Sequence, residues 1–277
     1  MLRFMTLGAV FLSLVLTPAG VGSEQGWMSQ FVQVVREYSY KPVPEVLLRD
    51  GDTRRIIEYL DAGCRIVSPR KSPLDFVRGL VQEGSLEGPV LFRPGIVYIK
   101  IRFFGRRTAG EFHEAMKKLA QRPLTGLIVD VRSNKGGLLG TTRTLIERWI
   151  DAGKGYLTLE QRGSRISAWV SSNPSPITLP TVVLVNAQTA SCSELFAASL
   201  QSAKKAKIVG TNTYGKQFVQ EVFPLDPQHV LFLTTAKVLA GNAGSDFSGV
   251  LPDVLVTDET AQLKTALMLL RTRGTGP

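Results

Sequence analysis

The sequence predicts a mixed α/β fold in which an N-terminal helical cap precedes a layered core. Two observations lead to this prediction: strand and helix patterns alternate between residues 96 and 209, and strand-like pairs follow towards the C-terminus. Alternation of this kind is typical of layered α/β proteins with parallel strands. The later pairs are expected to form antiparallel hairpins, so the sheet should be mixed. A composition of 44% hydrophobic and 20% charged residues fits a globular protein with a sizeable core.

The first residues have the pattern of a secretory signal peptide. Arg3 precedes an uncharged apolar run over 4–16, and a proline and several small residues follow. The run is shorter than the roughly 20 residues that a membrane-spanning helix needs. This favours a signal peptide over 1–23, cleaved between Ala19 and Ser23, over a retained anchor. We therefore expect export to the periplasm or the extracellular space.

Residues 24–88 are expected to form the N-terminal helical cap. Apolar residues recur at helical spacing over 24–66, with a turn or helix N-cap at the Asp-Gly-Asp sequence of residues 50–52. A further short helix is expected over 74–81. The linker before it is basic and contains two prolines.

The core is expected to run over 89–277. Its helices are predicted from amphipathic spacing, and its strands from short apolar or alternating runs bounded by glycine and proline. The predicted strands cover residues 90–92, 96–104, 127–131, 156–160, 166–170, 181–185, 208–209, 218–223 and 230–239. The predicted helices cover residues 109–120, 138–150, 191–204 and 259–270.

Charge and cysteine content limit the partners of the chain. The formal net charge is +10, which favours anionic partners, and we expect weak association with an anionic membrane surface or cell wall. No nucleic-acid-binding motif or metal-site spacing is present, so neither nucleic acid nor a metal or cofactor is expected. An oxidising compartment would permit a disulfide between Cys64 and Cys192. Cys192 stands at a predicted helix start, however, and is expected to be packed inward and reduced.

A serine stands where a predicted buried strand turns into a helix. Residues 186–194 follow the strand over 181–185 and place Ser191 at the helix start. The helix dipole and the following N–H group favour a developing negative charge on an oxygen there. Taken alone, the pattern fits an ordinary capping serine better, with Glu194 in the same cap.

A serine nucleophile needs a base, and the sequence favours a lysine over a histidine. Lys216 follows a glycine and precedes a predicted buried strand. Burial would lower its pKa and make the neutral amine available as a base. A solvated surface position is the ordinary alternative for a lysine. The two histidines, His113 and His229, neither follow a buried strand nor adjoin a glycine, which disfavours a Ser–His–Asp triad.

A pair of glycines ends the stretch Asp-Val-Arg-Ser-Asn-Lys-Gly-Gly over residues 130–137. Gly136 and Gly137 permit close backbone approach and unusual dihedral angles. Exposed N–H groups in such a turn can bind an oxyanion. Taken alone, the pair fits an ordinary strand–helix turn.

Four sequence motifs, taken together and in order, resemble those of the C-terminal processing, or tail-specific, serine peptidases. That family typically reads Ser-Ala-Ser-Ala-Ser-Glu around its nucleophile and Phe-Gly-Lys-Gly-x-Val-Gln around its base. This chain has Thr-Ala-Ser-Cys-Ser-Glu and Tyr-Gly-Lys-Gln-Phe-Val-Gln. The family's Asp-Leu-Arg-x-Asn-x-Gly-Gly matches residues 130–137, and its Gly-Val-x-Pro-Asp matches residues 249–253. The likeness extends from about Gly95 to Val256.

This resemblance implies a crotonase/ClpP-like peptidase core and a secreted serine endopeptidase that cleaves protein or peptide substrates with a Ser–Lys dyad and without a cofactor. Ser191 would be the nucleophile and Lys216 the base, oriented by two further side chains. The catalytic residues it implies are Ser191, Lys216, Gln220 and Glu194, and the oxyanion-hole residues are Gly137, Cys192 and, less favoured, Gly136.

Two departures from the family pattern leave other functions open. Family members usually carry a PDZ domain between a helical part and the core, but the stretch over 61–95 is too short for one. Cys192 replaces a small residue, and Gln217 replaces a glycine. The alternatives are a catalytically weak binding or regulatory protein on the same fold, a hydratase-like enzyme that would need coenzyme A, and a cysteine peptidase with Cys192 as nucleophile.

Overall fold

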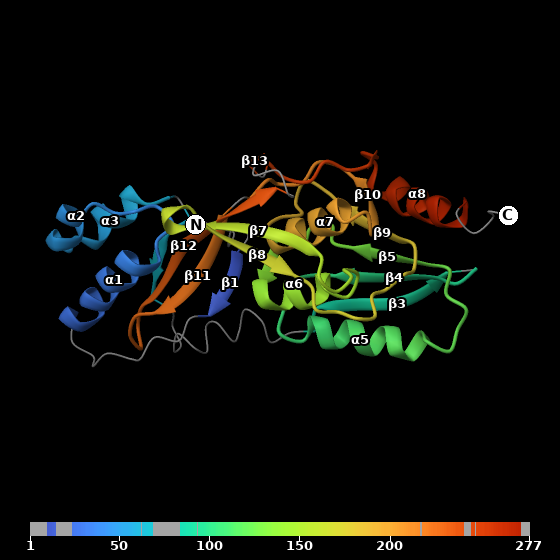
Figure 1. The fold of residues 1–277 in the computed structure, drawn as a ribbon, viewed down its shortest axis with the longest axis horizontal. Coiled ribbons are helices and arrows are strands. Elements are labelled where there is room, and N and C mark those ends of the chain that lie inside the picture. The colour runs from blue at the N-terminus through green and yellow to red at the C-terminus, as the bar shows by residue number, and fades with distance from the viewer. Residues whose placement is uncertain are drawn as a thin grey trace, which may run out of the picture.

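A computed structural model describes residues 10–14, 24–61, 63–68, 84–92, 94–216, 218–240, 245–246 and 248–272. The predicted signal peptide lies outside these residues except for 10–14, and the short helix predicted over 74–81 lies outside them altogether. The molecule is elongated, with the N-terminal helices at one end and the C-terminal helix at the other (Figure 1).

The first of two sheets has six strands, five of which run parallel. Its order is β14-β10-β9-β5-β4-β3, and only the edge strand β3 pairs in the antiparallel sense. The strands of this sheet are β3 (Leu86–Phe92), β4 (Ile96–Ile101), β5 (Gly126–Asp130), β9 (Thr181–Val185), β10 (Ala206–Gly210) and β14 (Val254–Leu255).

Strand β9 shows why this sheet carries helices on both faces. All five of its residues are buried, as expected of a central parallel strand. Val183 and Val185 pack in the main apolar cluster with residues of α5, α6 and α7, whereas Val182 and Leu184 pack in another cluster with α8. The helices are α5 (Thr108–Leu119), α6 (Leu139–Ile146), α7 (Cys192–Ser202) and α8 (Glu259–Thr272).

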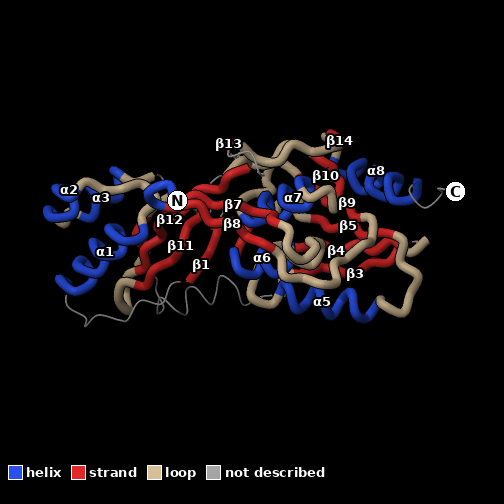
Figure 2. Tube along the Cα trace, viewed as in Figure 1, coloured by secondary structure: helices blue, strands red, loops and turns tan. Residues whose placement is uncertain are grey.

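The second sheet has eight strands, and the long strand β12 is its hub. The main order is β6-β1-β11-β12-β7-β8, and both β2 and β13 also pair with β12. Its strands, red in Figure 2, connect the cap to the core. They are β1 (Val10–Leu14), β2 (Arg65–Val67), β6 (Gly136–Leu138), β7 (Gly155–Gln161), β8 (Arg165–Val170), β11 (Phe218–Pro224), β12 (Val230–Ala240) and β13 (Ser245–Asp246).

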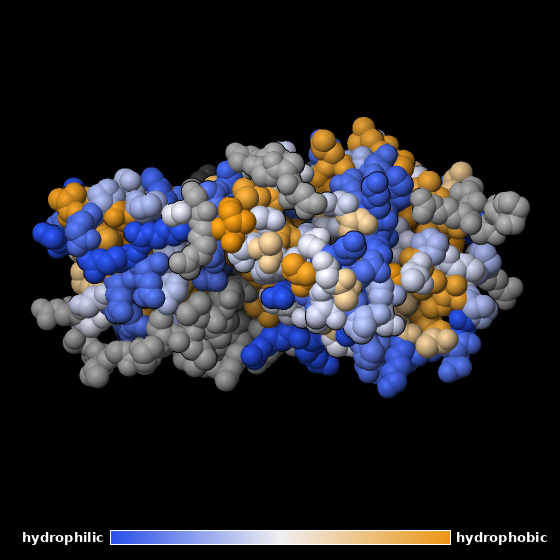
Figure 3. Space-filling view, viewed as in Figure 1, coloured by the Kyte–Doolittle hydropathy of each residue, from blue (hydrophilic) through white to orange (hydrophobic). Residues whose placement is uncertain are grey.

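Three helices of the cap cover β11 and β12. They are α1 (Glu24–Tyr38), α2 (Glu45–Asp50) and α3 (Thr53–Tyr59). Phe31 and Ile56 are fully buried there against Phe223 and Leu231. The outer surface of the cap is largely hydrophilic (Figure 3). The Asp-Gly-Asp turn is confirmed, because the Asp52 side chain accepts the backbone N–H of Arg54 at 3.0 Å and caps α3.

The predicted order of the core elements is confirmed, with corrections at several ends. Residues 65 and 66, predicted as helix, lie in β2, because β12 offers them an antiparallel partner. The helix predicted over 138–150 ends at Ile146. The glycine pair predicted as a turn forms most of β6. Strands β13 and β14 were not predicted, since two residues carry no readable periodicity.

Candidate active site

Ser191 lies at a sharp turn between β9 and α7. Its backbone has φ 60° and ψ −125°, a left-handed value that is uncommon for a residue with a side chain and is typical of functional sites. The residue is completely buried at the N-terminus of α7, and its Oγ has no hydrogen-bond partner among the described residues. A buried hydroxyl without a partner, placed at the positive end of a helix, is available to a bound molecule.

Hydrogen bonds between two loops hold this turn. Thr189 Oγ1 donates to the carbonyl of Val131 at 3.0 Å, and the Asn186 N–H donates to Thr189 Oγ1 at 3.0 Å. The Ala190 N–H donates to the carbonyl of Asn134 at 3.0 Å. The loop after β5 and the loop after β9 are therefore fixed to each other at the carboxyl edge of the sheet.

The carboxylate of Glu194 joins the serine turn to the lysine loop. It accepts the N–H of Ser191 at 2.7 Å and the hydroxyl of Thr213 at 2.6 Å. It also accepts the N–H groups of Gly215 at 2.6 Å and Lys216 at 3.0 Å. Burial raises the pKa of Glu194, although these hydrogen bonds oppose the rise. The capping interpretation is thus correct for Glu194, which in addition positions the loop that carries Lys216.

Lys216 is mostly buried and bonded to Gln220. Its Nζ donates to Gln220 Oε1 at 2.9 Å. Burial, and then the positive charge of Arg65, lower the pKa of Lys216 from 10.5 to about 8. A neutral amine is therefore accessible near neutral pH. No hydrogen bond joins Lys216 to Ser191 Oγ in this structure.

Gly136 and Gly137 adopt backbone conformations that favour glycine, with φ 104° and φ 146°. A Cβ on Gly136 would lie 2.8 Å from Ser191 Cβ and 3.1 Å from the nitrogen of Cys192, so this backbone contacts the serine directly. The Gly136 N–H already donates to Asn134 Oδ1 at 2.9 Å. The Gly136 N–H is therefore already engaged, which agrees with its being the less favoured of the three predicted oxyanion donors.

Both cysteines are buried free thiols, as predicted for Cys192. Cys192 Sγ donates to the carbonyl of Gly137 at 3.2 Å. Burial raises the pKa of the Cys192 thiol to about 12. A thiolate nucleophile at this position is accordingly disfavoured.

Neither histidine lies in the site. His113 is exposed on α5. His229 Nδ1 lies 2.9 Å from each carboxylate oxygen of Asp226, and its ring stacks on Trp27 at 4.3 Å. This pair sits at the turn after β11, whereas Lys216 precedes β11. Seven residues of strand separate them by roughly 20 Å.

Two contributors to the site were not singled out from the sequence. Asn134 shapes the glycine pair, and Thr213 bridges Glu194 to a distant loop, because its Oγ1 accepts the Val250 N–H at 2.7 Å. Both stand within or beside the four sequence motifs, which is the signal that could have identified them. The bond from Val250 also connects the fourth motif, over 249–253, to the other three through Thr213.

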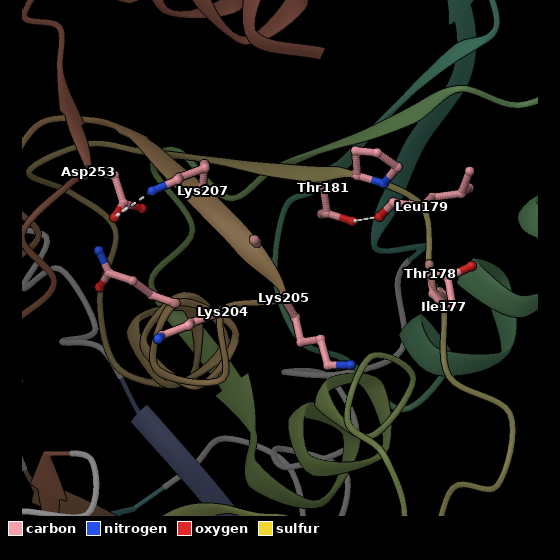
Figure 4. Close-up of a pocket in the computed structure, with 11 residues that line it drawn as sticks. Ile177, Thr178, Leu179, Thr181, Lys204, Lys205, Lys207 and Asp253 are labelled. Carbon is pink, nitrogen blue, oxygen red and sulfur yellow. Dashed lines mark hydrogen bonds and ion pairs between the residues drawn. The ribbon is translucent and has the colours of Figure 1, made fainter. Parts of the chain in front are cut away.

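The cavity drawn in Figure 4, about 620 Å³ in volume, lies at the opposite end of β9 and α7 from Ser191. Its lining includes Thr181 at the start of β9, and Lys207 of β10 lies 3.8 Å from Asp253 there.

Among the described residues, no group of His, Cys, Asp and Glu side chains could hold a metal ion. No helix in the described part of the chain is long and apolar enough to cross a membrane.

Comparison with known proteins identifies relatives. Carboxy-terminal processing protease CtpA of Bacillus subtilis is 34% identical over 144 residues, which are 52% of this chain and 31% of that protein. Carboxyl-terminal-processing peptidase 2 of Arabidopsis thaliana is 33% identical over 211 residues, 76% of this chain and 39% of that protein. The chain spans between 31% and 51% of the length of the first curated relatives it matches.

Solved structures agree with the fold. A photosystem II D1 C-terminal processing protease superposes with a TM-score of 0.54 at 25% identity, covering 75% of this chain and 52% of that one. A lipoprotein of Streptococcus agalactiae superposes with a TM-score of 0.70 over 93% of this chain and all of its own, but at 18% identity it supports the fold alone. The predicted mixed α/β, crotonase/ClpP-like core is confirmed. The model of peptidase family S41 matches residues 95–256, more than half of the chain, and the chain therefore belongs to that family.

Proposed function

We propose that this chain is a serine endopeptidase that cleaves protein or peptide substrates with Ser191 as nucleophile and Lys216 as general base. The observation that carries the proposal is the connection through Glu194, whose carboxylate holds the N–H of Ser191 and the N–H of Lys216 together. One buried side chain thereby fixes an unpartnered hydroxyl and a lysine of lowered pKa in one site.

In the proposed reaction, Ser191 Oγ attacks the peptide carbonyl while neutral Lys216 takes the hydroxyl proton. Lys216 then gives that proton to the leaving amine, and water hydrolyses the acyl-enzyme with the same lysine as base. Gln220 keeps Nζ in place through its 2.9 Å bond. The N–H groups of Gly137 and Cys192 stabilise the oxyanion.

The structure also suggests where a substrate backbone lies. Strand β1 fills the space between β6 and β11, with Phe11 opposite Gly137 and Leu12 opposite Gln220, parallel to both neighbours. Both neighbours carry parts of the proposed site, so an extended chain here passes beside Ser191. We place the substrate at this position once the predicted signal peptide, which includes β1, has been removed. Strand addition supplies affinity through main-chain hydrogen bonds with little demand on sequence.

A catalytically weak binding or regulatory protein on the same fold is the second candidate. One observation favours it: Ser191 Oγ has no bond to Lys216 in this structure. Catalytic hydrogen bonds often form only in the substrate complex, so this geometry does not decide against catalysis.

The experiment that separates the two candidates is substitution of the dyad. Ser191→Ala and Lys216→Ala should each abolish cleavage of a protein substrate. Labelling by a serine-reactive probe should be lost in Ser191→Ala. Circular dichroism should show that both variants keep the fold. If Lys216→Ala keeps more than about a tenth of wild-type kcat, Lys216 is not the base, since general-base catalysis contributes at least about a hundredfold.

The proposal extends to the setting of the enzyme. We propose export through the signal peptide over 1–23, a cap over 24–88 and a peptidase core over 89–277. The partners would then be exported proteins or peptides, with weak association of the basic surface with anionic membranes or cell wall.

A further inference from the structure

The turn that joins α3 to β2 lies against the proposed general base. We call its described residues, Asp61, Gly63, Cys64 and Arg65, the cap turn. Arg65 lies opposite Phe232 on β12, and β12 in turn places Thr234 opposite Gln220 of β11. The Thr234 N–H donates to Cys64 Sγ at 3.4 Å. Strand pairing thus fixes the cap turn beside Gln220, the partner of Lys216.

Gly63 lies directly against the side chain of Gln220. A Cβ on Gly63 would lie 2.3 Å from Gln220 Nε2 and 3.1 Å from its Cδ. Such distances cannot occur without displacement of the amide, which is itself buried and bonded to Lys216 Nζ. The Gly63 N–H donates to Asp61 Oδ1 at 2.8 Å, which holds the turn in this shape. The absence of a side chain at Gly63 therefore lets Gln220 reach Lys216.

Arg65 brings a positive charge to the same cap turn. Its guanidinium lies 4.1 Å above the ring of Phe232 and donates to the Gly63 carbonyl at 3.1 Å. Burial lowers the pKa of Arg65 itself. A charge so placed acts on its surroundings through a medium less polar than water.

Four groups set the electrostatic environment of Lys216 besides burial. Arg65 disfavours the protonated amine, whereas Asp61 of the same turn, and Cys192 and Glu194 of α7, favour it. The cap turn therefore supplies two opposed charges, one on each side of Gly63.

We propose that the cap turn is a positioning element for the general base: Gly63 lets Gln220 reach Lys216, and the charge of Arg65 disfavours the protonated form of Lys216. This inference rests on the proposed function, in which Lys216 is the base. The helical cap would then be part of the catalytic apparatus. The cap turn lies outside the four family motifs and outside residues 95–256, the stretch that the family model matches.

The test of the charge is a pair of substitutions with opposite expected signs. Arg65→Gln should raise the pKa of Lys216 by on the order of half a pH unit to one pH unit, and Asp61→Asn should lower it. Arg65→Lys, which keeps the charge, should stay near wild type. Arg54→Gln, which removes an exposed arginine of α3, is the matched control and should change nothing. The readouts are the acid limb of kcat/KM and the ¹³Cε chemical shift of Lys216 in lysine-labelled protein.

The test of the geometry is Gly63→Ala. It should lower kcat at least tenfold at the pH optimum, with KM little changed, because the base is displaced while the substrate strand position is untouched. Gly110→Ala is the control, since a Cβ at Gly110 on α5 meets open space. Folding of each variant is checked by its urea midpoint.

The outcomes are separable. Equal pKa values of Lys216 in Arg65→Gln, Asp61→Asn and wild type would overturn the electrostatic role, and wild-type kcat in Gly63→Ala would overturn the positioning role. The chemical shift reports the pKa of Lys216 without any substrate, so these results stand even if cleavage survives in Lys216→Ala, the result that refutes the proposed function instead.

Discussion

The buried lysine can be tested without knowledge of the substrate, through the pH dependence of stability. The change is Lys216→Met, which keeps a chain of similar length and removes the ammonium group. The folded-state pKa of Lys216 is about 8, below its ordinary 10.5. Because the unfolded chain binds the proton more tightly, the stability of the wild type rises with pH through this range. The destabilisation by the charged lysine has its full value below about pH 8 and decreases as the pH rises towards 10.5.

The expected magnitude follows from the two pKa values. Linkage with pKa values of about 8 and 10.5 makes the charge of Lys216 cost roughly 3 kcal/mol at pH 6 and roughly 1.5 kcal/mol at pH 9.5. The stability difference between Lys216→Met and wild type should therefore shift by roughly 2 kcal/mol in favour of the wild type over this interval. The change in apolar packing in Lys216→Met does not vary with pH and cancels from the comparison.

The assay is urea denaturation followed by tryptophan fluorescence, repeated at each pH. Lys118→Met, which removes an exposed lysine of α5, controls for the loss of one positive charge. If the difference for Lys216→Met is constant within about 0.5 kcal/mol from pH 6 to 9.5, the lysine is solvated in solution and the argument for a neutral base fails.

Three further predictions concern activity. In wild type, kcat/KM should fall about tenfold per pH unit on the acid side of an apparent pKa near 8, and a flat profile between about pH 5.5 and 9.5 would exclude a lysine base. Gly136→Ala should reduce kcat more than about a hundredfold, because its Cβ would press on Ser191 and its φ of 104° disfavours a side chain. The control Gly140→Ala should remain active, because a Cβ there meets open space. Full activity in Gly136→Ala would contradict the described contact. Amidation of a peptide's C-terminus should change kcat/KM less than about tenfold, since strand addition needs no free carboxylate, and a larger loss would show that the tail is read.

The sequence predicted the parts of this site that neighbouring residues encode. The turn before α7 and the burial of Lys216 follow from local motifs, and the run of β9, apolar except for Thr181, marks a strand buried on both faces. What could not be predicted depends on distant pairing. β2 is a strand because β12 accepts it, and Gly63 matters because of a side chain far along the chain. Neither contact leaves a periodicity in the cap sequence.

The shared strand β12 has a consequence for how a substrate would reach the proposed site. Cap and core both hydrogen-bond to β12. The cap does so through β2 at the start of the strand, and the core through β7 and β13 further along it. A swing of the cap as a separate body would break backbone pairs and uncover the apolar contacts of Phe223 and Leu231. Opening by a hinge between cap and core would thus carry a cost comparable to partial unfolding. Admission to the proposed site should be governed by insertion of a single extended strand beside β6 and β11, a local event in which the rest of the molecule keeps its shape.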